Sequence, residues 1–173
     1  RLDRIATYVG YLRAHPEEVQ ALGKDLSISV TAFFRKRDAF QVLERVVIPE
    51  LIQRSGHSGD AERPIRVWVS GCATGEEAYS IAILFLEQFD LAKRPRTLQI
   101  FATDIDDASL GVARAGIYPD AIGADVSPER LARFFARVDG QHFQVTKPLR
   151  ETVTFAPQNV IGDAPFSRLD LVS

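Results

Sequence analysis

The sequence predicts an α/β fold built on a doubly wound parallel sheet, and two segments carry this prediction. Residues 67–82 read VWVSGCATGEEAYSIA: an apolar strand-like run, a turn with Gly71 and Gly75, and then a helical pattern. Residues 98–106 read LQIFATDID, a second apolar run that ends in acids. Strand, glycine turn, helix and strand form the first half of a doubly wound unit, whose ligand lies beyond the carboxyl ends of the strands.

A helical region is predicted ahead of this unit, over residues 1–54. Apolar residues recur at helical spacing between residues 2 and 14, and Pro16 suits the first position of a second helix. Asp38 is the expected N-cap of a further helix, which Pro49 should kink or end early.

An exposed linker is expected at residues 55–64, SGHSGDAERP, and the α/β domain at residues 65–173. The expected elements of this domain are a strand at 65–70, a helix at 75–89, a strand at 98–103, a helix at 107–115 and a short helix at 128–135. Residues 142–156 alternate around Pro148 and suggest a small inserted β-hairpin. The chain contains no methionine and stops within the strand-like run 169–173, so we expect a fragment whose C-terminal strands are missing.

The type of ligand is indicated by Glu76 and Glu77, which occupy the first turn of the helix after the glycine turn. A bare helix N-terminus favours phosphate, whereas two carboxylates there repel a pyrophosphate and favour hydroxyls or a cation. The spacing of Gly71 and Gly75 also matches neither of the glycine patterns that bind dinucleotides or nucleoside triphosphates. Alternatively, the two acids simply complement the helix dipole.

Asp104 stands at the tip of the second predicted strand, where an acid in this fold hydrogen-bonds ribose hydroxyls. It could instead cap the following helix, although Asp106 or Asp107 could serve that purpose. A ribose, an ammonium and a sulfonium are what S-adenosylmethionine offers to such a set of carboxylates.

Composition narrows the class of protein. With 46% hydrophobic and 25% charged residues among 173, the chain can bury one core. It has no apolar run long enough for a transmembrane helix, and Cys72 is its one cysteine, which excludes an internal disulfide. We therefore expect a cytoplasmic protein without a metal site or membrane insertion, and the net charge of −2 argues against nucleic-acid binding.

At this point the sequence closely resembles the CheR family of chemotaxis-receptor glutamate methyltransferases. Besides GCATGEEAYSIA and FATDID, it contains SVTAFFR at residues 29–35, which is similar to the family's T-x-F-F-R signature, and FAPQN at residues 155–159. The resemblance implies a Rossmann-like class I methyltransferase sheet with S-adenosylmethionine as cofactor and S-adenosylhomocysteine as product. It also implies that the hairpin is the family's β-subdomain.

The resemblance assigns residues to the site. Arg35 is the expected catalytic residue, because a guanidinium can grip the acceptor's or the cofactor's carboxylate in a bidentate manner. Alternatively, residues 31–35 are a plain helix edge with Phe33 and Phe34 in the core, and Asn159 is a turn residue before Gly162. The residues expected to bind the cofactor are Ser29, Thr31, Arg35, Gly71, Gly75, Glu77, Asp104, Asn159 and Val160. Ser29 departs from the asparagine that the family often has there.

The leading hypothesis is methyl transfer to glutamate side chains on the cytoplasmic helices of methyl-accepting chemotaxis receptors, or on another signalling protein. A second hypothesis is a non-catalytic cofactor-binding module in a sensory protein. A third is an amino-methyltransferase, which would carry an Asn/Asp-Pro-Pro-aromatic loop directly after its fourth strand. Here DAPF, at residues 163–166, precedes that strand instead.

Overall fold

The chain divides into two compact units, Arg1–Val30 and Thr31–Ser173. The computed structural model describes residues 5–19, 22, 31–57 and 63–173. In the first unit, α1 (Ile5–Ala14) is the first predicted helix, and residues 16–19 are also helical. The boundary expected near residue 54 falls inside the second unit. Residues 55–57 of the expected linker belong to a helix, and residues 58–62 lie outside the described residues.

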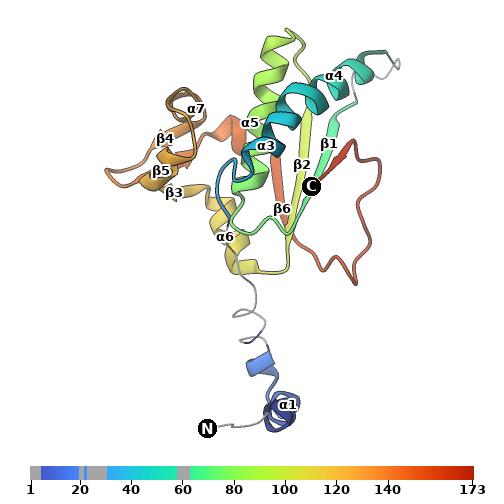
Figure 1. The fold of residues 1–173 in the computed structure, drawn as a ribbon, viewed down its shortest axis with the longest axis vertical. Helices are drawn as coiled ribbons and strands as arrows, with labels where there is room; N and C mark the ends of the chain where they lie inside the picture. The colour runs from blue at the N-terminus through green and yellow to red at the C-terminus, as the bar shows by residue number, and fades with distance from the viewer. Residues whose placement is uncertain (1–4, 20–21, 23–30, 58–62) are drawn as a thin grey trace. The chain divides into compact units, whose positions relative to one another are not determined.

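The second unit contains a parallel sheet with its helices and a small antiparallel sheet (Figure 1). Its elements, in chain order, are α3 (Arg37–Val42), the π-helical η1 (Leu43–Val47), α4 (Ile48–His57), β1 (Ile65–Ser70), α5 (Glu76–Leu91), β2 (Leu98–Asp104), α6 (Asp107–Ala115), β3 (Ile117–Pro119), the 3-10 helix η2 (Asp120–Ala124), α7 (Pro128–Phe134), β4 (Phe135–Arg137), β5 (His142–Val145), α8 (Lys147–Arg150), β6 (Val153–Pro157) and β7 (Leu171–Val172). The predicted strands and helices of the α/β domain up to residue 135 therefore form, with ends within two residues of those expected.

The main sheet has the strand order β6-β2-β1-β7, and all its strands are parallel. The chain moves outward from β1 through β2 to β6 and then returns to the other side of β1 with β7. This reversal between β1 and β7 is a topological switch point, the place where open α/β sheets bind their ligands. Ile65 pairs with Leu98 and Ser70 with Thr103, so β1 and β2 end at the same edge.

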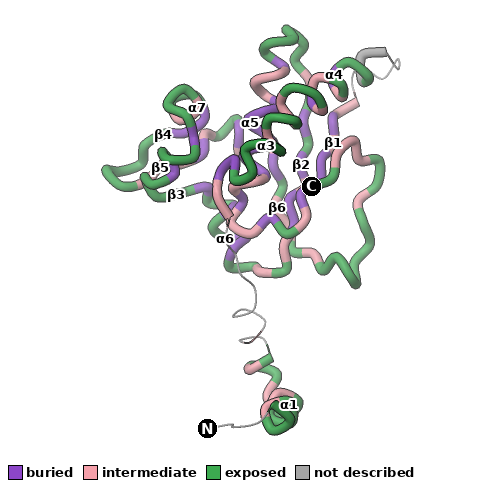
Figure 2. The backbone as a smooth tube through the Cα atoms, viewed as in Figure 1, coloured by how far each residue is buried: buried purple, intermediate pink, exposed green. Residues whose placement is uncertain are grey.

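The core lies where α5 meets the sheet on one side and α4 on the other. Val67 and Val69 of β1 are completely buried, and α5 is buried at every position from Ala78 to Phe85. The buried stretches of β1, β2 and α5 lie together in Figure 2. Because α5 has neighbours on both sides, its sequence is apolar around most of its circumference rather than along one stripe.

The opposite face of the sheet is partly covered by the connection between β6 and β7. Phe166 in this connection stacks on Phe101 of β2, with 4.7 Å between ring centroids, and meets Trp68 of β1 edge-on at 5.6 Å. The DAPF segment therefore contributes an aromatic side chain to packing against the sheet. Asp170 ends the connection and accepts hydrogen bonds from Arg63 and from the backbone of Arg66.

Two expectations about the helices before β1 need comment. The prediction that Asp38 is an N-cap is wrong: α3 begins at Arg37, and its N-cap, Lys36, makes no side-chain cap bond. Asp38 instead lies in the first turn, where its charge complements the helix dipole. Pro49 does not end the helix. It stands in the first turn of α4, directly after η1, and its missing N–H falls where the backbone hydrogen-bond pattern changes.

The prediction of one hairpin over residues 142–156 is also wrong. β5 pairs with β3 and β4 in the antiparallel sheet, whereas β6 joins the main sheet beside β2. Pro148 lies in the first turn of the short helix α8, a position that suits its fixed φ angle. A small antiparallel subdomain does exist, but it consists of residues 117–145, and its hairpin is β4–β5.

Candidate functional site

The candidate site lies at the carboxyl edge of the main sheet, beside the switch point. Three connections reach this edge: the glycine loop (residues 71–75) after β1, the turn after β2, and the connection after β6. Backbone hydrogen bonds tie them together, from Cys72 to the carbonyl of Thr103 and from Gln158 to that of Asp104, both at 3.0 Å. Residues far apart in the sequence thus form one rim.

The two glycines of this loop have different surroundings. Gly71 has a φ of 68°, and a Cβ built on it would meet no atom within 4 Å. Gly75 has a φ of 94°, and its Cβ would lie 2.9 Å from the Cβ of Ala113 and 3.1 Å from Phe155. Gly71 therefore leaves open space at the site, whereas Gly75 permits close packing of α5 against α6 and β6.

Asp104 is part of the structure of the glycine loop. One of its carboxylate oxygens accepts the N–H of Ala73 at 2.8 Å, and the other accepts the N–H of Asp106 at 2.9 Å. Each oxygen accepts one backbone N–H here and can accept a further donor. The cap of α6 is Asp106, which accepts the N–H of Ala108. The alternative role of Asp104 as an N-cap is therefore excluded.

Glu76 and Glu77 differ in the way they are held. The hydroxyl of Thr74 donates to the carboxylate of Glu76, at 2.6 Å to the nearer oxygen, and burial raises the pKa of Glu76. Glu77 accepts the hydroxyl of Ser173, at the end of β7, at 2.7 Å. The Glu77 carboxylate therefore connects α5 to the end of β7 beside the switch point, while the Glu76 carboxylate is bonded to Thr74 of the glycine loop.

The segment of residues 31–35 packs against the core and is not a helix edge, since α3 begins at Arg37. Phe33 is 1% exposed and meets the ring of Tyr118 edge-on at 5.0 Å. The N–H of Phe34 donates to the hydroxyl of Ser80, which donates to the carbonyl of Glu76 at 2.6 Å. Phe33 and Phe34 are thus core residues, Thr31 is partly buried, and Arg35 is exposed.

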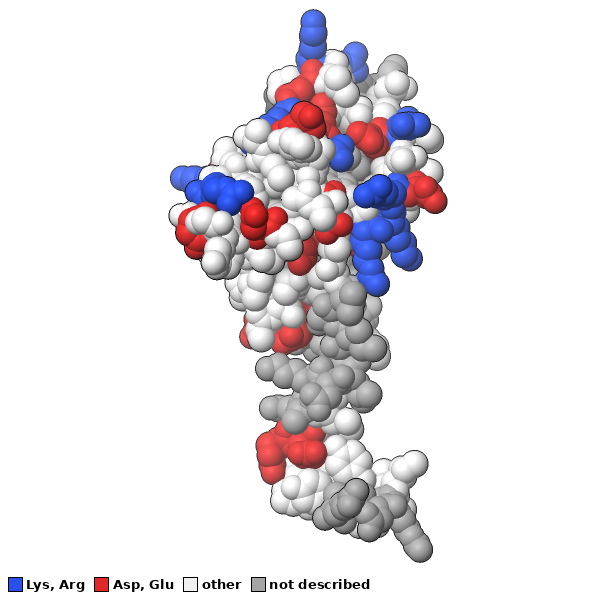
Figure 3. All heavy atoms as spheres, turned by 60° about the vertical axis from the view of Figure 1, so that its left-hand side comes forward, with Lys and Arg blue, Asp and Glu red and all other residues white. Residues whose placement is uncertain are grey.

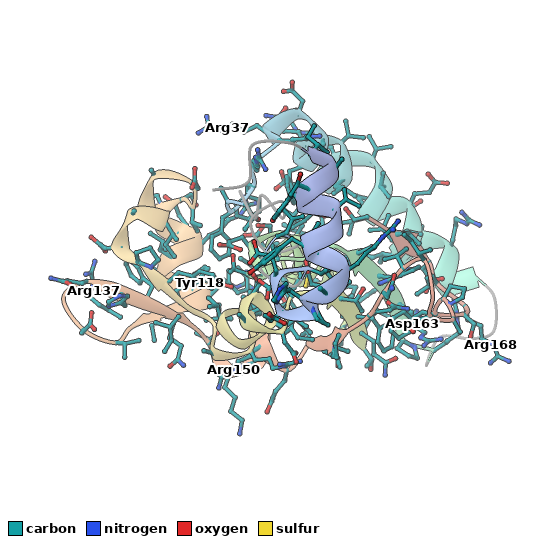
Figure 4. All side chains as sticks on the ribbon, turned by 90° about the horizontal axis from the view of Figure 1, so that it is seen from below. Arg37, Tyr118, Arg137, Arg150, Asp163 and Arg168 are labelled. Atoms are coloured by element: carbon teal, nitrogen blue, oxygen red, sulfur yellow. The ribbon has the colours of Figure 1, made fainter. Side chains whose placement is uncertain are left out.

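Sequence reasoning missed Tyr118, which links the subdomain to the glycine loop. Its hydroxyl donates to the carbonyl of Thr74 at 2.6 Å, and burial raises its pKa. Seen from below in Figure 4, Tyr118 lies on the side of the subdomain that faces the main sheet, whereas Arg137 lies at its outer end. No local sequence pattern marks Tyr118, because its role depends on a contact 44 residues away.

The remaining expected residues lie around the connection after β6. Asn159 and Val160 are exposed, and the side chain of Asn159 accepts the N–H of Ile161. The backbone carbonyl of Asn159 accepts the N–H of Gly162, so Asn159 is a turn residue, and its contact with the cofactor stays a prediction. Ile105, next to Asp104, is a further exposed apolar residue at this rim. Ser29 lies outside the described residues.

Cys72 is buried within the glycine loop and is 2% exposed. Burial, followed by the negative charge of Asp104, raises the pKa of its thiol to about 12. The thiol is therefore neutral at physiological pH and is not a nucleophile. Within the described part of the chain, three or more His, Cys, Asp or Glu side chains nowhere come together as metal ligands.

Switch point, glycine loop and strand-tip acid together define a Rossmann-like domain for a ligand that carries ribose hydroxyls. Comparison with known families identifies it further: the profile described as "CheR methyltransferase, SAM binding domain" matches residues 29–173. The chain belongs to this family, whose cofactor is S-adenosylmethionine. The site fits this cofactor, because Gly71 leaves room beside the loop and both oxygens of Asp104 can accept hydroxyl donors.

Several curated relatives are similar over most of this chain. A protein of Rhodobacter capsulatus described as "Uncharacterized 104.1 kDa protein in hypE 3'region" is 38% identical over 98% of this chain and 17% of its own length. The chemotaxis protein methyltransferase of Borreliella burgdorferi is 30% identical over 95% of this chain and 59% of its own. The chemotaxis protein methyltransferase of Escherichia coli is 34% identical over 86% of this chain and 48% of its own length. The chain thus spans about half the length of these methyltransferases.

Among solved structures, the glycopeptide N-methyltransferase MtfA complexed with sinefungin aligns with 90% of this chain and 45% of its own. Its TM-score of 0.32 and sequence identity of 14% are too low to support an argument about fold or function. In the described part of the chain, every helix is too short or too polar to cross a membrane.

Proposed function

We propose that this domain transfers the methyl group of S-adenosylmethionine to glutamate side chains of methyl-accepting chemotaxis receptors or a related signalling protein. The observation that carries the proposal is the attachment of residues 31–35 to the start of α5, directly after the glycine loop, through Phe34, Ser80 and Glu76. This attachment brings the exposed Arg35 from a separate part of the sequence to the cofactor domain. The names of the relatives from Borreliella burgdorferi and Escherichia coli support the same activity.

The chemistry needs few groups from the protein. A glutamate side chain has an ordinary pKa of about 4.3, so at neutral pH it is already a carboxylate and needs no general base. When bound, the cofactor supplies an electrophilic methyl group on a sulfonium. A carboxylate oxygen of the acceptor would form the new bond to this carbon as the bond from carbon to sulfur breaks, and the electron pair of the broken bond would stay on sulfur. No proton moves.

The tasks left to the protein are binding and orientation. We assign the ribose hydroxyls to Asp104 and the cation-facing carboxylate to Glu77, with Thr31, Asn159 and Val160 as further cofactor contacts. Arg35 is the residue that orients a carboxylate, because its planar guanidinium offers two parallel donors. Ser29 belongs to the same proposed set.

A direct test is calorimetric titration of S-adenosylhomocysteine into the full-length protein, with NAD as the control ligand. Saturable binding of S-adenosylhomocysteine alone is expected, followed by base-labile methyl esters on a receptor preparation incubated with labelled cofactor. Arg35→Ala should abolish most ester formation and leave S-adenosylhomocysteine affinity within about threefold, while the neighbouring Lys36→Ala serves as a control for charge. Binding of NAD instead, or equal ester formation by Arg35→Ala, would contradict these assignments.

A second candidate is a non-catalytic cofactor-binding module within a larger protein. It is favoured by one observation, the Rhodobacter capsulatus relative, of which the matched part is only 17%. The same two measurements separate the candidates. Cofactor binding without any methyl ester on the partner would favour the module.

A further inference from the structure

Phe34 adopts an uncommon backbone conformation next to the proposed catalytic residue. Its φ is 51°, in the left-handed region that side chains other than glycine disfavour. Arg35 follows directly, so the backbone of Phe34 sets the direction in which the chain presents Arg35. Such a conformation persists only where the surroundings hold it. The contacts of Phe34 therefore hold the backbone that leads to Arg35.

A cation from the small subdomain covers the ring of Phe34. The guanidinium carbon of Arg130, on α7, lies 4.6 Å from the centroid of this ring, and Phe40 meets the ring edge-on at 5.4 Å. Phe34 itself is 8% exposed. A guanidinium over an aromatic face at this distance is an attractive cation–π arrangement, and it is stronger where water is excluded.

Arg130 is in turn fixed from two other elements. Its Nε donates to one oxygen of Glu87 at 3.0 Å and its Nη2 to the other at 2.7 Å, a bidentate pair with α5. The same Nη2 donates to Glu44 of η1 at 3.1 Å. Burial opposes the charge of Arg130, but Glu87 and Glu44 offset this effect and raise its pKa. The guanidinium plane is therefore held by carboxylates in the orientation that covers Phe34.

We propose that Arg130 is a positioning residue for the methyl transfer: together with Glu87 and Glu44, it holds Phe34 in its left-handed conformation and thereby aims Arg35 at the acceptor. Arg130, Glu87, Glu44 and Phe34 form the Arg130 cluster. The inference rests on the proposed function, in which Arg35 orients a carboxylate. It also connects the subdomain to the transfer step, because Arg130 is supplied by α7.

The chain offers a matched control in Arg133, on the next turn of the same helix. Arg133 also forms an ion pair with α5, through Asp90, and its guanidinium lies 4.7 Å from an aromatic centroid, that of Phe134. Ion pairs such as these intermix acidic and basic side chains on this side of the second unit (Figure 3). Arg133 thus has the same chemistry as Arg130, but its guanidinium lies over Phe134 and not over Phe34.

The test compares Arg130→Gln with Arg133→Gln in the full-length protein. Loss of a cation–π contact and a bidentate pair should lower kcat about tenfold or more in Arg130→Gln, with S-adenosylhomocysteine affinity within about twofold of the wild type. Hydrogen exchange of the Phe34 amide should accelerate by a similar factor, because its bond to Ser80 then breaks more often. Arg133→Gln should change none of these quantities by more than about twofold.

Two other variants, Phe34→Leu and Arg130→Lys, cover the case in which Arg130→Gln folds poorly. Phe34→Leu keeps an apolar side chain and removes the aromatic face, so it should reproduce the loss of kcat, and Arg130→Lys should retain part of the wild-type rate. The effects of Arg130→Gln and Phe34→Leu should be less than additive. Full additivity, or unchanged Phe34 amide exchange in Arg130→Gln, would overturn the proposal. A wild type that binds cofactor but forms no ester would refute the proposed function, while the exchange measurement would still test the cluster.

Discussion

Replacement of Asp104 by asparagine tests the site most directly, because asparagine keeps the shape and removes the charge. In the wild type, both carboxylate oxygens accept a backbone N–H, from Ala73 and from Asp106. The side-chain amide of asparagine has one acceptor oxygen and one donor nitrogen, so one of these two N–H groups loses its partner. Under the proposed assignment, the ribose hydroxyls of the cofactor also lose their charged acceptor.

The size of the effect follows from these contacts. Hydrogen bonds to a charged group contribute about 1.5–3 kcal/mol, which corresponds to a loss of affinity of about tenfold to slightly more than a hundredfold. If the Ala73 bond is the one that breaks, the glycine loop is also less well ordered. The larger losses in this range would then be expected. Calorimetric titration of S-adenosylhomocysteine measures the change directly.

Asp106→Asn is the control, two residues away in the same turn. Asp106 caps α6 and accepts from Ala108 and Ser109, and asparagine is as good an N-cap as aspartate. This variant removes the same charge from the same rim and should leave the affinity within about twofold. Equal affinities of Asp104→Asn and wild type, or equal losses in both variants, would refute the assignment of the ribose hydroxyls to Asp104.

Further substitutions test the glycine loop and its surroundings. Tyr118→Phe removes a buried hydrogen bond to the loop worth about 1 kcal/mol and should weaken S-adenosylhomocysteine binding about fivefold. Tyr79→Phe is the control: it loses a similar hydrogen bond, to the carbonyl of Ala113, and should lower only Tm. Gly75→Ala should lower the free energy of unfolding, measured with denaturant, by about 2–4 kcal/mol, because backbone strain and overpacking combine. Gly71→Ala should lower it by less, because only the backbone strain applies there. Burial raises the pKa of Glu76, so its charge costs stability above the ordinary carboxyl range. Glu76→Gln should therefore raise Tm at neutral pH. It should not do so at an acidic pH where Glu76 is protonated in both the folded and the unfolded chain.

The parts of the fold that local patterns specify were predictable from the sequence. β1 and β2 are apolar except at the paired Arg66 and Gln99, which lie on the less covered face of the sheet, and each strand ends where polar residues begin. Asp104 follows from its place at such an end. Asp38 misled the prediction because aspartate suits both the N-cap and the first turn of a helix, and only the backbone distinguishes the two.

Other features depend on partners that are distant in the sequence. Residues 142–156 alternate in polarity, yet β5 finds its partners in β3 and β4, and β6 finds its partner in β2. Alternating polarity indicates a strand with one covered face, but it does not identify the strand that pairs with it. In the same way, the sequence presents Gly71 and Gly75 as a pair, although only Gly75 has packed neighbours.

The length of α6 explains how the subdomain reaches the site. At a rise of about 1.5 Å per residue, the 16 residues of α5 extend about 24 Å, whereas the nine residues of α6 extend about 14 Å. A longer crossover helix would carry the chain past the first turn of α5 before β3 begins. Instead, α6 ends at Gly116, which has a φ of 61°. A Cβ built on Gly116 would lie 3.4 Å from the hydroxyl of Tyr79, so the chain passes close to α5 here. β3 therefore starts beside the first turn of α5, and Tyr118 can bond to the glycine loop.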